Sequence, residues 1–151
     1  MIRRLVVAAA FCAGFASLAG VTTVVAQSNP IAERQQLMKN LSQAARAPGG
    51  MLKGEVPFDL AAVQTTLKTF ADVATKAPAL FPDNSKTGND TAALPKVWTD
   101  KADFNGLWTK FEKDAVAAQA SIKDEASFKA AFPVLMRSCG GCHEGYRAKK
   151  G

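Results

Sequence analysis

Histidine and cysteine are scarce in this 151-residue chain, which has one histidine, three cysteines and one tyrosine. A single histidine excludes a bis-histidine metal site, and three cysteines are too few for a disulfide framework or a four-cysteine zinc site. The chain has no sustained alternation of apolar and polar residues, so strands are not expected. It also has no recognisable nucleophile, paired carboxylates or glycine-rich phosphate loop, so the sequence does not indicate an enzyme.

The formal charge of the chain is +6, from 19 Lys and Arg against 13 Asp and Glu. The basic residues do not form a stripe with interleaved aromatic residues, so nucleic acid is not an expected partner. The pair Lys149-Lys150 is interpreted as a solvated helix end.

The first 26 residues have the pattern of a secretory signal peptide: a short cationic start, an uncharged apolar run over residues 5–25, and small residues before Gln27. We therefore predict cleavage of residues 1–26, one mature domain over residues 27–151, and a periplasmic location without stable membrane insertion. An uncleaved anchor is the alternative, because the apolar run is almost long enough to span a bilayer. Cys12 leaves with the signal peptide.

Four segments of the mature chain have helical periodicity. Asn29, Asp59 and Asp124 are expected to cap the first, second and fourth helices. The expected helices cover about 30–45, 60–77, 104–122 and 125–149. Pro48-Gly49-Gly50 should bend or interrupt the first, and residues 82–99 should form a loop. This pattern predicts an all-α fold, an antiparallel four-helix bundle in up-down-up-down order with a ligand between facing helices.

The segment near the C-terminus reads Cys139-Gly140-Gly141-Cys142-His143. On a helix, two thiols at this spacing lie on one face and can add to the two vinyl groups of one porphyrin, while the next imidazole coordinates the iron. The motif therefore predicts one haem c, bound covalently through Cys139 and Cys142, with His143 as a metal ligand. The alternatives are a redox-active cysteine pair and half of a zinc site. A redox-active pair would follow a βαβ pattern, which is absent here, and a structural zinc site needs four ligands, of which the mature chain has three.

The motif lies on the last expected helix, whose apolar stripe continues through both thiols and should bring the haem inside the bundle. The stripe consists of Phe128, Phe132, Leu135, Cys139, Cys142 and Tyr146. Pro133 removes one backbone hydrogen bond and should kink this helix or delay its regular start. Without haem, we expect an apolar cleft lined by Leu37, Leu135 and the aromatic residues of the third helix.

The chain resembles the class II c-type cytochromes, the cytochrome c′ family. The resemblance extends over the mature chain, and the motif continues as Cys-x-x-Cys-His-x-x-Tyr-Arg. The segments that carry it are residues 34–39, 53–59, 80–82, 95–98 and 139–147. The resemblance implies a haem-bearing four-helix bundle that exchanges electrons with redox proteins, which the sequence does not identify. It leaves open whether the chain forms a homodimer through its first two helices, as many relatives do.

Two branches of this family differ on the face of the iron opposite the histidine. In cytochrome c′ proper a non-ligating residue of the first helix faces a five-coordinate iron that can bind NO or CO. In the cytochrome c-556 type a methionine ligates instead. The matching position here is Met38, so the resemblance implies His143/Met38 ligation and is closest to the c-556 type. Core packing is the alternative role of Met38.

The other methionines of the mature chain are less suited to ligation. Met136 shares a helix with His143 and cannot reach the opposite haem face, and Met51 lies beyond the Pro-Gly-Gly break, where its geometry is uncertain. Arg34, one turn before Met38, is an unusual residue to bury without a carboxylate partner, and in the family the matching arginine lies near the haem propionates. The alternative for Arg34 is a solvated position.

These residues predict outer-sphere electron transfer, with both axial positions of the iron filled and no substrate chemistry. A gas-binding protein with an open distal site is the alternative function. A haem peroxidase is less favoured, because the sequence has no distal acid-base pair.

Overall fold

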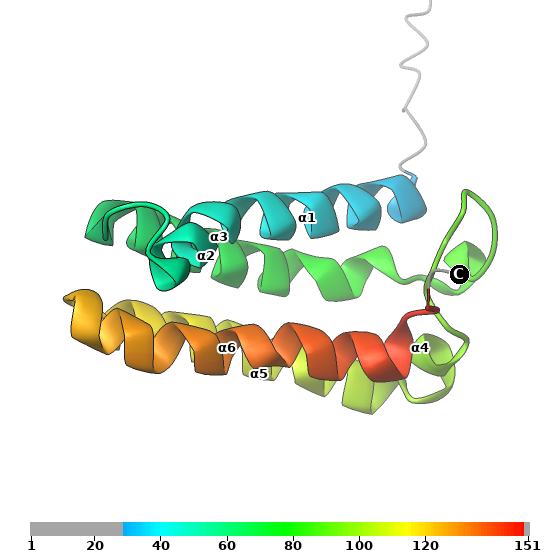
Figure 1. Ribbon diagram of the computed structural model, residues 1–151. Coiled ribbons are helices and arrows are strands. Elements are labelled where there is room, and N and C mark those ends of the chain that lie inside the picture. Colours follow the sequence, from blue (N-terminus) through cyan, green and yellow to red (C-terminus); the bar gives the residue numbers. More distant parts are fainter. Residues whose placement is uncertain (1–28, 150–151) are drawn as a thin grey trace, which may run out of the picture.

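A computed structural model describes residues 29–149, which form a four-helix bundle (Figure 1). The long helices are α1 (Pro30–Ala44), α3 (Leu60–Lys76), α5 (Lys101–Ser121) and α6 (Glu125–Tyr146). Successive long helices run in opposite directions, and α1 and α3 form one layer above α5 and α6. The predicted fold class is confirmed. The predicted signal peptide lies outside the described residues, and within those residues no helix is long and apolar enough to cross a membrane.

Side-chain caps start the helices where the sequence predicts them. Asn29 and Asp59 each accept a backbone N–H three residues ahead at 3.1 Å. Asp124 accepts the backbone N–H of Ser127 at 2.8 Å, and the Ser127 hydroxyl accepts the Asp124 N–H in return, at 3.1 Å. This reciprocal pair is a capping box, which satisfies donors that the first turn leaves free.

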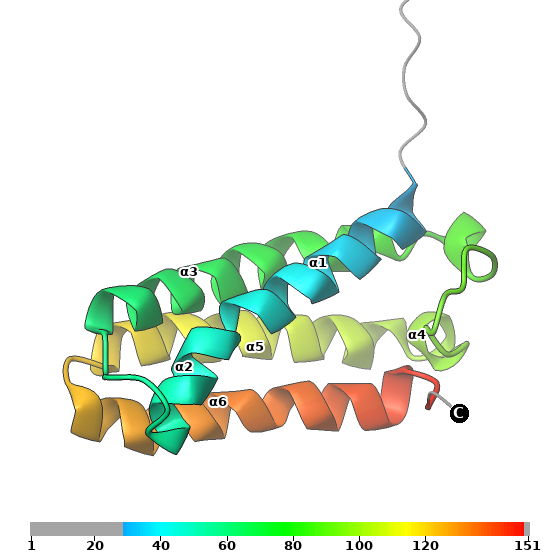
Figure 2. The same ribbon diagram turned by 45° about the horizontal axis from the view of Figure 1, so that its top comes forward.

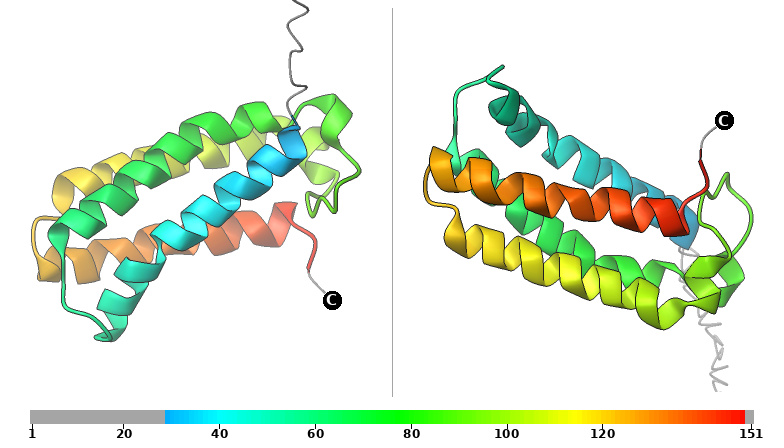
Figure 3. Two further views of the ribbon diagram at one scale, coloured as in Figure 1. Left: turned by 90° about the horizontal axis from the view of Figure 1, so that it is seen from above. Right: turned by 60° about the horizontal axis from the view of Figure 1, so that its bottom comes forward.

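The Pro-Gly-Gly segment bends the chain without ending its helical course. A second helix, α2 (Arg46–Lys53), contains these residues and is separated from α1 only by Ala45. Because Pro48 has no N–H, the carbonyl of Ala44 loses its donor in the next turn. The hydroxyl of Thr66 on α3 lies 3.0 Å from that carbonyl and also 3.0 Å from the Ala62 carbonyl of its own helix, so it supplies a shared donor in place of the missing one. Figures 2 and 3 show the result, since α1 runs obliquely over the bundle and α2 continues toward the first half of α6.

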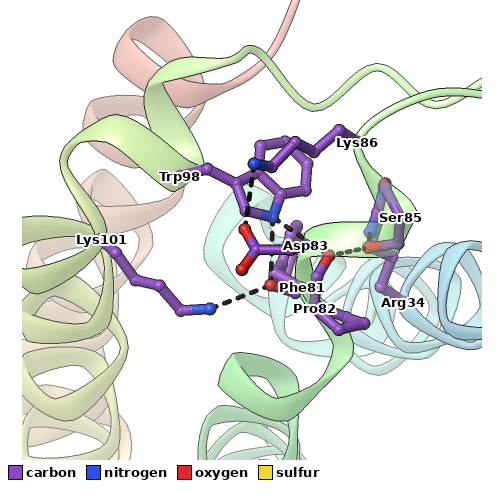
Figure 4. Close-up of polar contacts among 8 residues, drawn as sticks. All are labelled: Arg34, Phe81, Pro82, Asp83, Ser85, Lys86, Trp98 and Lys101. Atoms are coloured by element: carbon purple, nitrogen blue, oxygen red, sulfur yellow. Dashed lines mark hydrogen bonds and ion pairs between the residues drawn. The ribbon is translucent and has the colours of Figure 1, made fainter.

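The connection between α3 and α5 is more ordered than the predicted loop. It contains two 3₁₀ turns, η1 (Ala77–Leu80) and η2 (Asp83–Ser85), and the short helix α4 (Lys96–Thr99). The indole N–H of Trp98 lies 3.2 Å from the carbonyls of Phe81 and Pro82, and the ammonium of Lys101 donates to the Phe81 carbonyl at 3.1 Å (Figure 4). These long-range bonds, rather than local periodicity, hold the segment.

Helix α6 passes through Pro133 without interruption and ends at Tyr146, three residues before the predicted end at Lys149. The residues after it do not continue the helix because they pair with the loop before α4. The Leu94 N–H donates to the Tyr146 carbonyl at 3.0 Å, and the Ala148 N–H donates to the Ala92 carbonyl at 2.8 Å. We call residues 86–94 the strap, because they make hydrogen bonds both to the C-terminal end of α6 and to the N-terminal half of α1.

Candidate functional site

A cavity of about 550 Å³ lies between α1 and α6, with α3 and α5 behind it. Phe70, Phe104, Trp108 and Phe111 contribute large apolar surfaces to its wall. A mostly apolar cavity of this size with a few polar groups is the ordinary form of a cofactor site. The aromatic residues of the third predicted helix line it as expected. Leu37 and Leu135 do not line the cavity. Leu135 is buried in the core, and Leu37 is partly buried and packs against that core.

Cys139, Cys142 and His143 of the Cys-x-x-Cys-His motif line this cavity. Both thiols are half-buried on the cavity side of α6, and burial raises the pKa of Cys139 and Cys142. Redox-active cysteine pairs have lowered thiol pKa values, so this environment does not favour the redox-pair alternative. Burial, and to a smaller extent the charge of Arg147, lowers the pKa of His143. The imidazole is therefore neutral near pH 7, the form that coordinates a metal.

One methionine faces the motif from another helix. Met38 on α1 lines the same cavity as His143. Met136 also lines it but belongs to α6, whereas Met51 is buried in α2 and borders a separate hollow near the link between α2 and α3. Within residues 29–149, Met38 is therefore the only methionine that reaches the cavity from a helix other than that of the histidine.

The guanidinium of Arg34 is buried at the edge of the cavity, with 4% of the residue exposed. One terminal nitrogen donates to the Leu80 carbonyl at 3.0 Å and the Ser85 hydroxyl at 2.8 Å. The other donates to the Ser85 carbonyl at 2.9 Å and the Thr91 hydroxyl at 2.6 Å. Figure 4 shows Arg34 and Ser85 in this network. The solvated alternative for Arg34 is therefore wrong.

Neutral oxygens and aromatic rings surround the Arg34 charge. Its guanidinium carbon lies 4.7 Å from the ring centroid of Phe81 and 5.7 Å from that of Trp98, within the range of cation–π attraction. Burial lowers the pKa of Arg34, but an arginine remains protonated at neutral pH. The four hydrogen bonds use the hydrogens of both terminal nitrogens, so Nε–H is the donor left for another partner.

The charged side chains that line the cavity favour an anionic occupant. Arg34, Lys110 and Arg147 are among the lining residues, and no Asp or Glu of residues 29–149 is. Trp108, in the same wall, buries an indole N–H that has no acceptor among the described residues. An occupant with a flat apolar body, carboxylate groups and an iron for His143 fits this set of side chains, and haem c has these properties.

Comparison with known proteins agrees with this chemistry. Residues 29–147 match the sequence profile of a family described as Cytochrome C'. The chain belongs to the cytochrome c′ family. A cytochrome c′ of Rhodopseudomonas palustris is 48% identical over 140 residues, which cover 89% of this chain and 96% of the relative. A cytochrome c-556 of the same organism is 34% identical over 155 residues and covers all of both chains.

The solved structure of a cytochrome c′ from R. palustris superposes on the chain with a TM-score of 0.81 and 50% identity, over 83% of this chain and all of that one. Proteins of this family carry covalently bound haem c, and Cys139 and Cys142 are present here for its attachment. Relatives with both branch names match this chain, so the comparisons leave the sixth ligand of the iron open.

The sequence interpretation missed part of the cavity wall. Thr91, Ala92 and Ala93 of the strap line the cavity, as does Lys110 on α5. The strap lies in a segment that periodicity describes only as a loop, and its unusual length was the one signal available. Lys110 lies on the exposed side of α5 and carries no local mark that separates it from the other lysines.

Proposed function

We propose that this member of the cytochrome c′ family is an exported electron carrier of the periplasm, with haem c held by Cys139 and Cys142 and ligated by His143 and Met38. The bound haem supplies an iron that accepts and returns one electron. The observation that supports this proposal best is the presence of Met38 and His143, from two different helices, in the wall of one apolar cavity.

Each side chain has a distinct part in this proposal. The neutral imidazole of His143 binds the metal on the α6 side, and the thioether of Met38 binds it on the α1 side. A thioether prefers ferrous over ferric iron, so Met38 raises the reduction potential. With both sides occupied no substrate needs to bind, which is why we propose an electron carrier rather than an enzyme.

We also propose that Arg34 contacts a haem propionate through Nε–H, the one donor that the surrounding oxygens leave unused. Lys110 and Arg147, which also line the cavity, add positive charge that favours an anionic cofactor. We propose two kinds of protein partner, which are redox proteins and a second copy of the chain that packs through α1 and α3. Cleavage after residue 26 completes the proposal.

The alternative function is a five-coordinate protein that binds NO or CO. The observation that favours it is the name of the 48% identical relative, cytochrome c′. In that case Met38 would pack over the iron without ligating it.

An optical spectrum of the purified ferric protein tests the proposal. We expect a low-spin spectrum with the weak red band of sulfur-to-iron coordination. Met38→Ala should abolish that band, make the iron largely high-spin and lower the reduction potential. Met136→Ala, on the same cavity but on α6, is the matched control and should retain the band. A wild-type spectrum that is already high-spin, with rapid CO uptake, would contradict Met38 ligation and favour the gas-binding alternative.

A further inference from the structure

We infer that the strap holds α1 at a set distance from α6 across the haem cavity, and that Thr91, through Arg34, positions Met38. This inference rests on the proposed function in one respect, since it takes Met38 as the residue that faces the iron. Thr91 and Arg34 are therefore positioning residues, not ligands.

The strap is bound to α1 by two side chains of consecutive residues. Arg34 donates to the Thr91 hydroxyl at 2.6 Å, and Gln35 donates to the Asn89 carbonyl at 3.0 Å. Arg34 and Met38 are one turn apart on the same side of α1, and both line the cavity. The bond to Thr91 is one of the four that fix Arg34, and together they fix the rotation and depth of the turn that carries Met38.

The other end of the strap is bound to α6 just after the histidine. Leu94 and Ala92 make backbone hydrogen bonds of 3.0 and 2.8 Å with Tyr146 and Ala148. Tyr146 is three residues from His143, in the last turn of α6. The strap therefore links the turn of α1 that precedes Met38 to the turn of α6 that follows His143.

Direct contacts between α1 and α6 are few. Helix α1 packs mainly on α2, α3 and η1, whereas α6 packs mainly on α5 and α4, and the cavity lies between α1 and α6. The strap itself has a defined shape, because Gly88, Asn89 and Asp90 are three successive residues with left-handed φ angles of 95°, 46° and 52°. Glycine, asparagine and aspartate are the residues that adopt this conformation most readily.

The rate at which CO binds to the ferrous protein measures how firmly Met38 is held over the iron. Thr91→Val removes the hydroxyl that Arg34 uses while keeping the shape of the side chain. We expect this variant to bind CO about tenfold faster than wild type, the order of effect of one hydrogen bond to a charged group. Thr91→Ser restores a hydroxyl and should bind CO at the wild-type rate.

Thr87→Val is the matched control, because it makes the same exchange at an exposed position of the same strap. It should leave the rate unchanged. Should Thr91→Val fail to fold, Ser85→Ala is the second variant, because it removes another acceptor of the same guanidinium. It should also accelerate CO binding, but by less, because the Ser85 carbonyl still accepts a hydrogen bond from Arg34.

A double-variant cycle identifies the route of the effect. If the strap acts through Met38, adding Thr91→Val to Met38→Ala should not accelerate CO binding further. Equal acceleration in both backgrounds, or equal rates for wild type, Thr91→Val and Thr87→Val, would overturn the inference. The spin state of the wild-type protein reports separately on the proposed function, because a five-coordinate iron would still be covered by Met38 and still respond to the strap.

Discussion

The two ends of the bundle differ in what fills the space between the helices. At the end where α5 turns into α6, aromatic side chains fill the core, with ring centroids 5.5 Å apart for Phe58 and Phe128 and 5.2 Å apart for Phe128 and Phe132. At the other end, α1 and α6 border a cavity of about 550 Å³, and α6 presents the half-buried Cys139 and Cys142.

The difference shows that the residues that contribute most to stability and the residues that hold the bound group lie at opposite ends of the bundle. The aromatic end is close-packed by the chain's own side chains, whereas the cavity end depends on a bound group for its filling. Variants at the aromatic end should therefore change the free energy of unfolding and leave the optical spectrum unaltered. Variants at the cavity end should alter the optical spectrum.

Removal of both attachment thiols should have the largest effect. Cys139→Ser/Cys142→Ser should contain no covalent haem, because serine does not form the two thioethers. The measurement is haem-linked peroxidase staining after denaturing electrophoresis of protein made with a cytochrome maturation system. Arg137→Ala, an exposed neighbour on α6, should stain like wild type. Absence of stain from the wild type itself would contradict the haem assignment.

Truncation of the aromatic core should have the next largest effect. Phe128 is fully buried, contacts Phe58 and Phe132, and does not line the cavity. Phe128→Ala should lower the free energy of unfolding in guanidinium chloride by about 4 kcal/mol without altering the optical spectrum of the folded protein. Val134→Ala, at a position 55% exposed on the same helix, should change it by less than about 0.5 kcal/mol. A spectral change in Phe128→Ala would break the division between the two ends.

A smaller effect is expected where α3 supports the bend between α1 and α2. Thr66→Val removes the hydroxyl that serves the Ala44 carbonyl and should lower the free energy of unfolding by about 1 kcal/mol. Thr65→Val is the control, because among the described residues its hydroxyl bonds only to the Ala61 carbonyl of its own helix. Equal loss of stability in the two variants would show that the contact across the helices contributes nothing of its own.

The smallest effect concerns the cap of α6 at the aromatic end. Hydrogen bonds, first from the Ser127 side chain and then from its backbone, lower the pKa of Asp124. The charged carboxylate therefore stabilises the fold above its ordinary pKa, and this contribution is lost as the pH falls through the lowered value. Asp124→Asn should reduce Tm by about 2 °C at pH 7, and the difference should shrink below about pH 4. Glu112→Gln, in the middle of α5 and away from any helix cap, is the control and should leave Tm at pH 7 unchanged.

Much of the fold could be predicted from residues close together in the chain. Asn29, Asp59 and Asp124 cap the helices because a cap involves residues only three positions apart. The end of α6 could not be predicted in this way, because Tyr146 is followed by residues that pair with the strap more than 50 positions earlier. The Pro-Gly-Gly segment remained helical for a similar reason, since α3 supplies a donor from outside.

The sequence by itself determined the chemistry of attachment, because the spacing of Cys139, Cys142 and His143 places all three on one side of a single helix whatever surrounds it. Only the tertiary structure decided which methionine reaches their cavity from another helix and which oxygens surround Arg34. The partners of Arg34 lie 46 to 57 positions away along the chain. Contacts at that distance depend on how the helices pack, and no local pattern of residues encodes them.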